Sequence, residues 1–209
     1  MSKHGIWKGG FELPNGRDIQ RQSALLIDTI RKKPNGLILY FLDNHGEVIF
    51  DQLVIEQLLL AGYRVAVVGR GETVRDDVTV DEAQAIFEKN MHFTDFFQNG
   101  SLSVITDGSF LLGADLTQSY KYPAFLDSWR DSIAYIAKGA GNFHTLLGQN
   151  LSLPQFHIRM FKNSRSTYNR IGRLKGKKID QRSPYELAFV FYLTTMQSIF
   201  RRDFTETAN

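Results

Sequence analysis

The chain has 209 residues, of which 43% are hydrophobic and 22% charged, and its formal net charge is +3. This balance is typical of a globular protein of one or two small domains, and it excludes global disorder because the apolar content can offset the ordering entropy. The sequence contains no cysteine, which excludes disulfides, thiolate metal sites, iron–sulfur clusters and a thiol nucleophile.

The first part of the chain is predicted to form an arm, a helix and a strand. Residues 1–17 are rich in Gly, Lys and Pro and suggest a loosely held arm, whereas residues 18–32 repeat apolar side chains at helical spacing. After the turn-forming sequence Pro-Asn-Gly at 34–36, residues 37–42 form a continuous apolar run. Such a run is typical of a strand buried on both faces of a parallel sheet.

A strand–helix–strand unit is predicted over residues 37–69. Apolar residues between positions 49 and 59 indicate a helix, and Gly62 is placed to cap its C-terminal end. Residues 64–69 form the second buried run. Because the unit is only about thirty residues long, we expect a parallel strand pair joined by a right-handed crossover.

The later elements continue this alternation. Thr79 and Glu82 have the spacing of a capping box, which predicts a helix that extends to about residue 87. Further strands are predicted at 102–106, 132–137 and 156–161, with one helix ending near residue 147 and a terminal helix from 183 to about 200. The pattern predicts a three-layer α/β/α sandwich with a mainly parallel, Rossmann-like sheet.

The predicted elements divide the chain into an N-terminal arm and helix (1–36), an α/β core (37–163), and a basic segment with a C-terminal helix packed on the core (164–209). Residues 159–182 hold nine Lys or Arg against one Asp. A solvated surface, a phosphorylated ligand or an acidic partner would each suit this charge, and nucleic acid is the least favoured partner. The terminal helix is apolar on nearly all sides, so it is either buried or covers a partner in a homo-oligomer.

The expected location is the cytoplasm. The sequence shows no signal-peptide core near its start, and no apolar run in it is long enough to cross a bilayer. The lack of cysteine also fits a reducing compartment. We therefore expect no contact with a membrane.

Polar side chains follow the predicted strands, where ligands bind in sheets of this kind. Asp43 and Asn44 follow the first strand, Asp77 lies beyond the second, and Lys138 opens a Gly-containing turn after a later one. Carboxylate and amide oxygens suit a hard divalent cation, and a lysine at a helix start suits a phosphate. Metal and phosphate together indicate phosphoryl chemistry. Turn formation, helix capping and solvation remain alternative explanations for each motif taken alone.

Four sequence blocks resemble the metal-dependent damage-control phosphatases, most closely the prokaryotic branch of that family. The blocks are LDNHGEVIFD at 42–51, VRDDVTVDEA at 74–83, the Gly108-Ser109 turn with Gly113, and DSIAYIAKGAGNF at 131–143. They occur in the family's order, and the resemblance covers about residues 37–163. It implies that this part of the chain is the catalytic core.

The resemblance implies a divalent metal cation, Mn²⁺, Mg²⁺, Co²⁺ or Ni²⁺, held by Asp43, Asn44 and Asp77. It further implies that Lys138 and Asn142 bind the phosphate and support its transfer to water, with Asp43 as the third catalytic residue. The sequence leaves open whether Asp43 attacks phosphorus covalently or only positions the metal and a water.

The resemblance also implies a wider set of residues that contact the phosphate or substrate. Glu47 and Asp51 are motif acids that face the substrate or support the metal ligands. Backbone or hydroxyl donors would come from the remaining positions Gly108, Ser109 and Gly139. Asp76 stands where the family carries Asn, and its extra carboxylate could raise metal affinity or repel an anionic substrate.

The function implied is the hydrolysis of a small phosphorylated metabolite, such as a sugar phosphate or the phosphate of a damaged cofactor. Only about 36 residues precede the first predicted strand, whereas the family carries a substantial helical region there. Two alternatives therefore stay open: a specialised metal-dependent pathway enzyme on the same scaffold, and a non-catalytic module that binds metal or phosphate.

Overall fold

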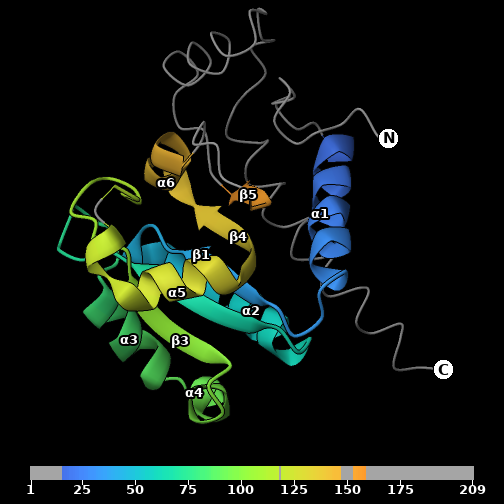
Figure 1. The fold of residues 1–209 in the computed structure, drawn as a ribbon, viewed down its shortest axis with the longest axis horizontal. Helices are drawn as coiled ribbons and strands as arrows, with labels where there is room; N and C mark the ends of the chain where they lie inside the picture. Colours follow the sequence, from blue (N-terminus) through green and yellow to red (C-terminus); the bar gives the residue numbers. More distant parts are fainter. Residues whose placement is uncertain (1–15, 118, 147–152, 159–209) are drawn as a thin grey trace, which may run out of the picture.

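A computed structural model describes residues 16–117, 119–146 and 153–158, which form a sheet with helices on both faces (Figure 1). The predicted arm lies outside these residues up to position 15, and its last two positions belong to the first helix. The basic segment beyond 158 and the terminal helix also lie outside the described residues. The division of the chain into three parts therefore stays a prediction.

All five strands are parallel and occur in the order β3-β2-β1-β4-β5. Their bounds are Leu37–Phe41 for β1, Arg64–Gly69 for β2, Leu102–Thr106 for β3, Ser132–Lys138 for β4 and Gln155–Ile158 for β5. The chain moves outward from β1 in one direction, then returns to place β4 on the other side of β1. Doubly wound sheets bind ligands at such a reversal, beyond the carboxyl ends of the strands, which here is the edge between β1 and β4.

Helices cover the two faces of the sheet and bury alternate side chains of its strands. The bounds are Gly16–Arg31 for α1, Val48–Leu60 for α2, Val80–Glu88 for α3, Thr94–Gln98 for α4, Pro123–Asp131 for α5 and Gly139–Leu146 for α6. One apolar cluster joins α1, α2 and α3 to Ile38 and Tyr40, and a second joins α5 and α6 to Leu39 and Phe41. The architecture is therefore the predicted α/β/α sandwich.

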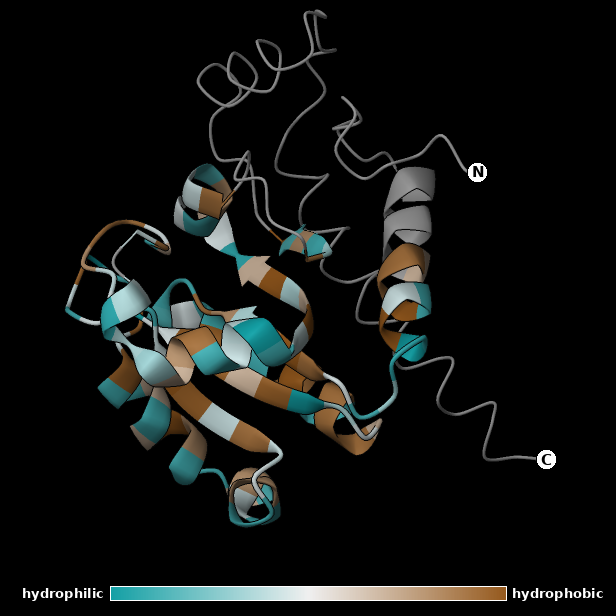
Figure 2. Cartoon of the chain, in the orientation of Figure 1, coloured by the Kyte–Doolittle hydropathy of each residue, from teal (hydrophilic) through white to brown (hydrophobic). Residues whose placement is uncertain are grey.

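The central strands β1 and β4 are mostly apolar because both of their faces are covered (Figure 2). Every residue of β1 and of β4 is buried, including Lys138 at the end of β4. A fully buried apolar side chain contributes roughly 1.5–3 kcal/mol, so these two central strands anchor the fold. They also fix the loops that follow them, which carry the predicted site.

The local signals at helix ends are confirmed. Thr79 Oγ1 accepts a hydrogen bond from the Glu82 amide at 3.3 Å, and the Glu82 carboxylate accepts one from the Thr79 amide at 2.9 Å, which completes the capping box at α3. Gly62, just after α2, has a φ of +85°, the left-handed conformation expected after a helix end. None of the described helices is long and apolar enough to span a membrane.

Two helices, α4 and α5, were not predicted from the sequence. Both are short, and α5 opens with Pro123 at its first turn, a signal that the sequence does carry. The last strand begins one residue before the prediction, and its predicted part beyond Ile158 lies outside the described residues.

Candidate metal and phosphate site

Backbone hydrogen bonds bring together the two loops that carry the predicted metal ligands. Asn44 and Asp77 form an isolated antiparallel bridge, and the Val78 amide donates to the Asp43 carbonyl at 2.9 Å. The loop after β1 is thereby fixed against the loop after β2. Asp43, Asn44 and Asp77, although separated by a complete helix and strand, belong to one structural unit at the carboxyl edge of the sheet.

The start of α6, which follows β4, contacts this pair of loops from the other side of β1. Gly139 has a φ of +79°, and a Cβ at this position would overlap the Asp43 carboxylate. Only glycine combines this backbone conformation with so close an approach. The first turn of α6, predicted to bind phosphate, therefore lies directly against the predicted metal ligand Asp43.

Asp43 is only partly exposed and lies among other acids. Burial, together with the negative charges of Asp77 and Glu47, raises the pKa of Asp43 from 3.8 to about 6, although Arg70 and Lys138 oppose the shift. The positive charges of the protein thus only partly offset the cost of ionising the Asp43 carboxylate. A positive ligand would relieve this imbalance.

Lys138 is buried and held by two carboxylates. Its Nζ lies 2.7 Å from Glu47 Oε2 and 3.0 Å from Asp51 Oδ1, and the Tyr40 hydroxyl donates to the same Asp51 oxygen at 2.8 Å. Burial alone would lower the pKa of Lys138, but Asp51 and Glu47 outweigh it and raise the pKa above its ordinary value. Lys138 is therefore a fixed positive charge, as a phosphate-binding role requires.

Asp51 completes this group from α2 and is fully buried. Burial raises the pKa of Asp51, while the contacts with Lys138 and Tyr40 act in the opposite direction. Its Oδ2 atom has no hydrogen-bond partner within the described part of the chain. Asp51 thus supports Lys138 from behind, whereas Glu47 is about 39% exposed and can face a ligand.

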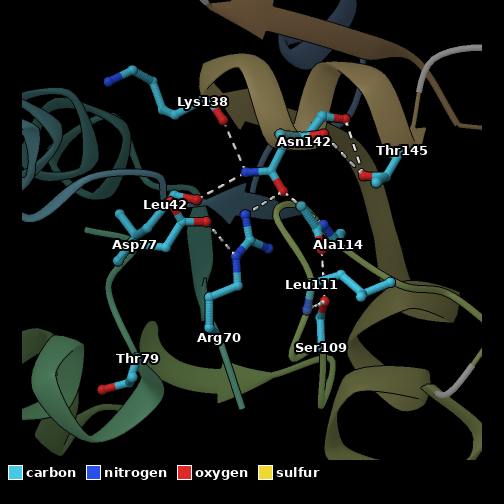
Figure 3. Close-up of polar contacts among 12 residues, drawn as sticks. Leu42, Arg70, Asp77, Thr79, Ser109, Leu111, Ala114, Lys138, Asn142 and Thr145 are labelled. Atoms are coloured by element: carbon cyan, nitrogen blue, oxygen red, sulfur yellow. Dashed lines mark hydrogen bonds and ion pairs between the residues drawn. The ribbon is translucent and has the colours of Figure 1, made fainter. Parts of the chain in front are cut away.

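Sequence reasoning missed Arg70, which is 1% exposed and lies at the centre of the site (Figure 3). Its Nε donates to Asp77 Oδ2 and its Nη2 to Asn142 Oδ1, both at 2.9 Å. A signal existed, since Arg70 is a charged residue between two glycines at the end of an apolar strand. A basic residue at a strand end is usually solvated, and the sequence alone gives no reason to read this one otherwise.

Asn142 uses its whole side-chain amide within the protein. Its Nδ2 donates to the carbonyls of Leu42 and Lys138 at 2.8 Å each, and its Oδ1 also accepts from the Ala114 amide at 2.9 Å. With Arg70 these contacts fill both donors and both lone pairs. Asn142 ties the ends of several strands together, and its predicted contact with phosphate stays a prediction.

The loop after β3 lies beside the site but binds mainly to itself. Asp107 is buried and accepts hydrogen bonds from the amides of Ser109 and Asp115, at 3.0 and 2.9 Å, and burial raises the pKa of Asp107. The Ser109 hydroxyl donates to the Gly113 carbonyl at 2.6 Å, and Gly108 packs tightly against Tyr122. The predicted donors Gly108 and Ser109 therefore shape this loop in the structure.

Asp76 and His45 lie on the exposed side of the site. The Asp76 carbonyl accepts from the His45 amide at 3.0 Å, and the Asp76 side chain is exposed. His45 Nε2 lies 3.6 Å from Glu82 Oε1, at the start of α3. The contact directs the His45 ring toward the cap of α3.

The donor set fits a hard divalent cation. Within the described ranges, no group of three or more His, Asp or Glu side chains is arranged to hold a metal, and the ligand set implied by the resemblance, two carboxylates and the Asn44 amide, stays a prediction. Among the described residues, the acids Asp43, Glu47, Asp51 and Asp77 lie near the two cations Lys138 and Arg70. Acidic groups thus outnumber basic ones here, and oxygen ligands are the type that divalent cations prefer.

A family model matches most of the chain and shows which family it belongs to. Residues 16–196 match the model of the damage-control phosphatase ARMT1-like domain. The chain belongs to this family. The resemblance seen in four sequence blocks is thereby confirmed.

Two curated relatives of this ARMT1-like chain come from archaea. An uncharacterized protein of Methanocaldococcus jannaschii is 30% identical over 149 residues, which cover 68% of this chain and 45% of the relative. A damage-control phosphatase of Pyrococcus horikoshii is 27% identical over 125 residues, which cover 59% of this chain and 39% of the relative. The chain thus matches less than half the length of each of these proteins.

The fold is also that of a solved family structure. A crystal structure of a family protein from Pyrococcus horikoshii superposes with a TM-score of 0.52 at 23% identity, covering 75% of this chain and 46% of the other. At this identity the likeness concerns the fold alone. It places the sheet of this ARMT1-like chain among known structures of the family.

Proposed function

We propose that this chain is a divalent-metal-dependent phosphatase that acts on a small phosphorylated metabolite. One observation carries the proposal: beyond the carboxyl ends of β1 and β4, Asp43, one of a group of acids that outnumber the nearby cations, lies against the glycine turn that opens α6. The acids suit a cation and the turn suits an anion, so a metal and a phosphate can bind side by side.

Asp43, Asn44 and Asp77 would hold the cation, Mn²⁺, Mg²⁺, Co²⁺ or Ni²⁺. One oxygen of Asp77 is engaged by Arg70, so the other would serve the metal. When bound, such a cation neutralises phosphate oxygens and lowers the pKa of a coordinated water.

Lys138 and the first turn of α6 would bind the phosphoryl group. The Lys138 ammonium is kept charged by Glu47 and Asp51, and a fixed cation stabilises charge that develops on phosphoryl oxygens. Gly139 lets the backbone of α6 approach Asp43 without a side chain between them. The residues of this turn therefore orient the phosphorus toward Asp43.

Hydrolysis of an aryl phosphate and of a panel of sugar phosphates tests the proposal. We expect turnover with Mn²⁺, Co²⁺, Ni²⁺ or Mg²⁺ that is abolished by a chelator. Asp77→Asn keeps an acceptor for Arg70 but removes a charged ligand, so metal affinity and activity should each fall about 10–100-fold or more.

Asp95→Ala is the matched control, because Asp95 is an exposed acid on α4. It should leave both quantities unchanged. Failure to hydrolyse any phosphoester with any of the four metals would refute the phosphatase. Undiminished metal affinity in Asp77→Asn would refute the ligand assignment alone.

A further inference from the structure

Arg70 is a buried cation for which the proposed reaction gives no direct task. It is the largest fully buried side chain in the described part of the molecule. Burying a guanidinium is unfavourable unless it is paired and hydrogen-bonded. The presence of a buried arginine beside the site therefore needs an explanation other than packing.

The contacts of Arg70 join parts of the site that are far apart in sequence. Its side chain links Asp77, on the loop after β2, to Asn142, which lies on α6 and follows Arg70 by 72 residues (Figure 3). Asn142 in turn binds the carbonyls of Leu42, which precedes Asp43, and of Lys138. The guanidinium of Arg70 thus connects the loops that carry the proposed metal ligands with the junction of β4 and α6, where the proposed phosphate-binding lysine Lys138 lies.

The backbone of Arg70 holds the same loop. Its amide donates to the Val78 carbonyl at 2.9 Å, and its carbonyl accepts from the Val80 amide at 2.8 Å. Arg70 therefore holds Asp77 in two ways, through the backbone of the residues that follow it and through its own carboxylate. The planar guanidinium offers several donors in fixed directions, which a lysine ammonium cannot reproduce.

We propose that Arg70 is a positioning residue that sets the Asp77 carboxylate for the metal and, through Asn142, sets Lys138 for the phosphate. The inference rests on the proposed function. Positioning and a simple counter-ion role predict opposite effects on metal affinity. A positive charge beside a cation site opposes metal binding, so if Arg70 were only a counter-ion, its removal would raise the metal affinity.

Titration of the purified, metal-free protein with Mn²⁺, followed by calorimetry and by electron paramagnetic resonance, separates these roles. Arg70→Lys keeps the charge but not the two-pronged contact, and Arg70→Met removes both. If Arg70 positions Asp77, both variants should bind Mn²⁺ about 10–100-fold more weakly, the range expected for groups that orient metal ligands. Thermal melts of the same samples report whether each variant is folded.

Arg64 provides the control, since it begins β2, the strand that Arg70 follows, and is exposed at the opposite edge of the sheet. Arg64→Lys and Arg64→Met should leave Mn²⁺ affinity unchanged. If Arg70→Met does not fold, Arg70→Lys decides, because it retains the charge that Asp77 requires.

Unchanged Mn²⁺ affinity in folded Arg70→Lys, or tighter binding in Arg70→Met, would overturn the positioning role and leave the phosphatase proposal intact. A lower melting temperature with unchanged affinity would likewise identify a purely structural residue. If the unsubstituted protein binds none of Mn²⁺, Co²⁺, Ni²⁺ and Mg²⁺, the proposed function fails and the inference with it.

Discussion

Gly139 shows how a single residue can determine the geometry of the site. Its positive φ and its contact with Asp43 leave no room for a side chain. We predict that Gly139→Ala destabilises the protein and displaces Asp43, because backbone strain of about 1–2 kcal/mol adds to a steric overlap. Chemical denaturation and Mn²⁺ titration measure the two effects.

Gly100 allows the two causes to be separated. It has a φ of +75°, similar to that of Gly139, but a Cβ there would meet nothing within 4 Å. Gly100→Ala should therefore carry only the backbone strain and leave metal affinity unchanged. Equal losses of stability in the two variants would show that the approach of α6 to Asp43 is not tight.

The raised pKa of Asp43 predicts a conflict between stability and metal binding. Because the folded-state pKa is about 6 against 3.8 in the unfolded chain, the folded protein binds the proton more tightly. The metal-free protein should lose stability as the pH rises from about 4 to 6, and the loss should persist above pH 6. At about 1.4 kcal/mol per pKa unit, it amounts to at most about 3 kcal/mol.

Asp43→Asn removes the titrating group while keeping its size. In the presence of a chelator, urea denaturation at pH 8 should show this variant to be more stable than the unsubstituted protein, and the difference should shrink toward pH 4. A variant that is less stable at pH 8 would contradict the poorly compensated charge assigned to Asp43.

At the scale of elements, β1 and β4 carry two buried tyrosines in different hydrogen-bonding situations. Tyr40 donates to Asp51, whereas the hydroxyl of Tyr135 has no partner among the described residues. Both side chains are fully buried. The pair therefore isolates the contribution of the contact between β1 and α2.

Tyr40→Phe should lower the free energy of unfolding by about 1–3 kcal/mol, because Asp51 is buried and loses a donor. Tyr135→Phe should be neutral or stabilising, since it removes a buried hydroxyl that has no partner among the described residues. Thermal and urea denaturation of the two variants test this ordering. The reverse ordering would show that Tyr40 does not support the Asp51–Lys138 pair.

Elements with strong periodicity or continuous apolar runs were predictable, and those that depend on tertiary contacts were not. The runs at 37–42 and 64–69 gave β1 and β2, because burial on both faces leaves a clear pattern. The nine-residue α5 has a single buried residue, Phe125, and so leaves a weak pattern. Short helices of this kind depend on packing more than on propensity.

The candidate site was likewise only partly predictable from the sequence. The sequence blocks identified Asp43, Asp77 and Lys138 by type and spacing, but not the hydrogen bonds that hold them. Arg70 and the fully engaged amide of Asn142 became evident only from contacts across 72 and 100 residues. Sequence patterns indicate which residues are present, whereas long-range contacts determine which of them remain available to a ligand.

At the scale of the whole molecule, the chain matches 45% and 39% of the lengths of its curated archaeal relatives. Its sheet nevertheless carries the proposed metal ligands, the lysine and the glycine turn together. The substrate, the cytoplasmic location and the homo-oligomer stay predictions. They concern surfaces and segments beyond the candidate site.

The position of β4 beside β1 also has a consequence for how the site comes into being. Lys138 meets Glu47 across 91 residues, and Asn142 reaches Leu42 across 100. Contacts this distant in sequence form late, because the chain between them must first be ordered. During synthesis, a ribosome would release the first half of the sheet with its acids exposed and unmatched. The proposed phosphate-binding part of the site, which needs Lys138 and the turn at Gly139, should therefore form only when β4 docks, whereas the proposed metal ligands all precede β4 in the chain.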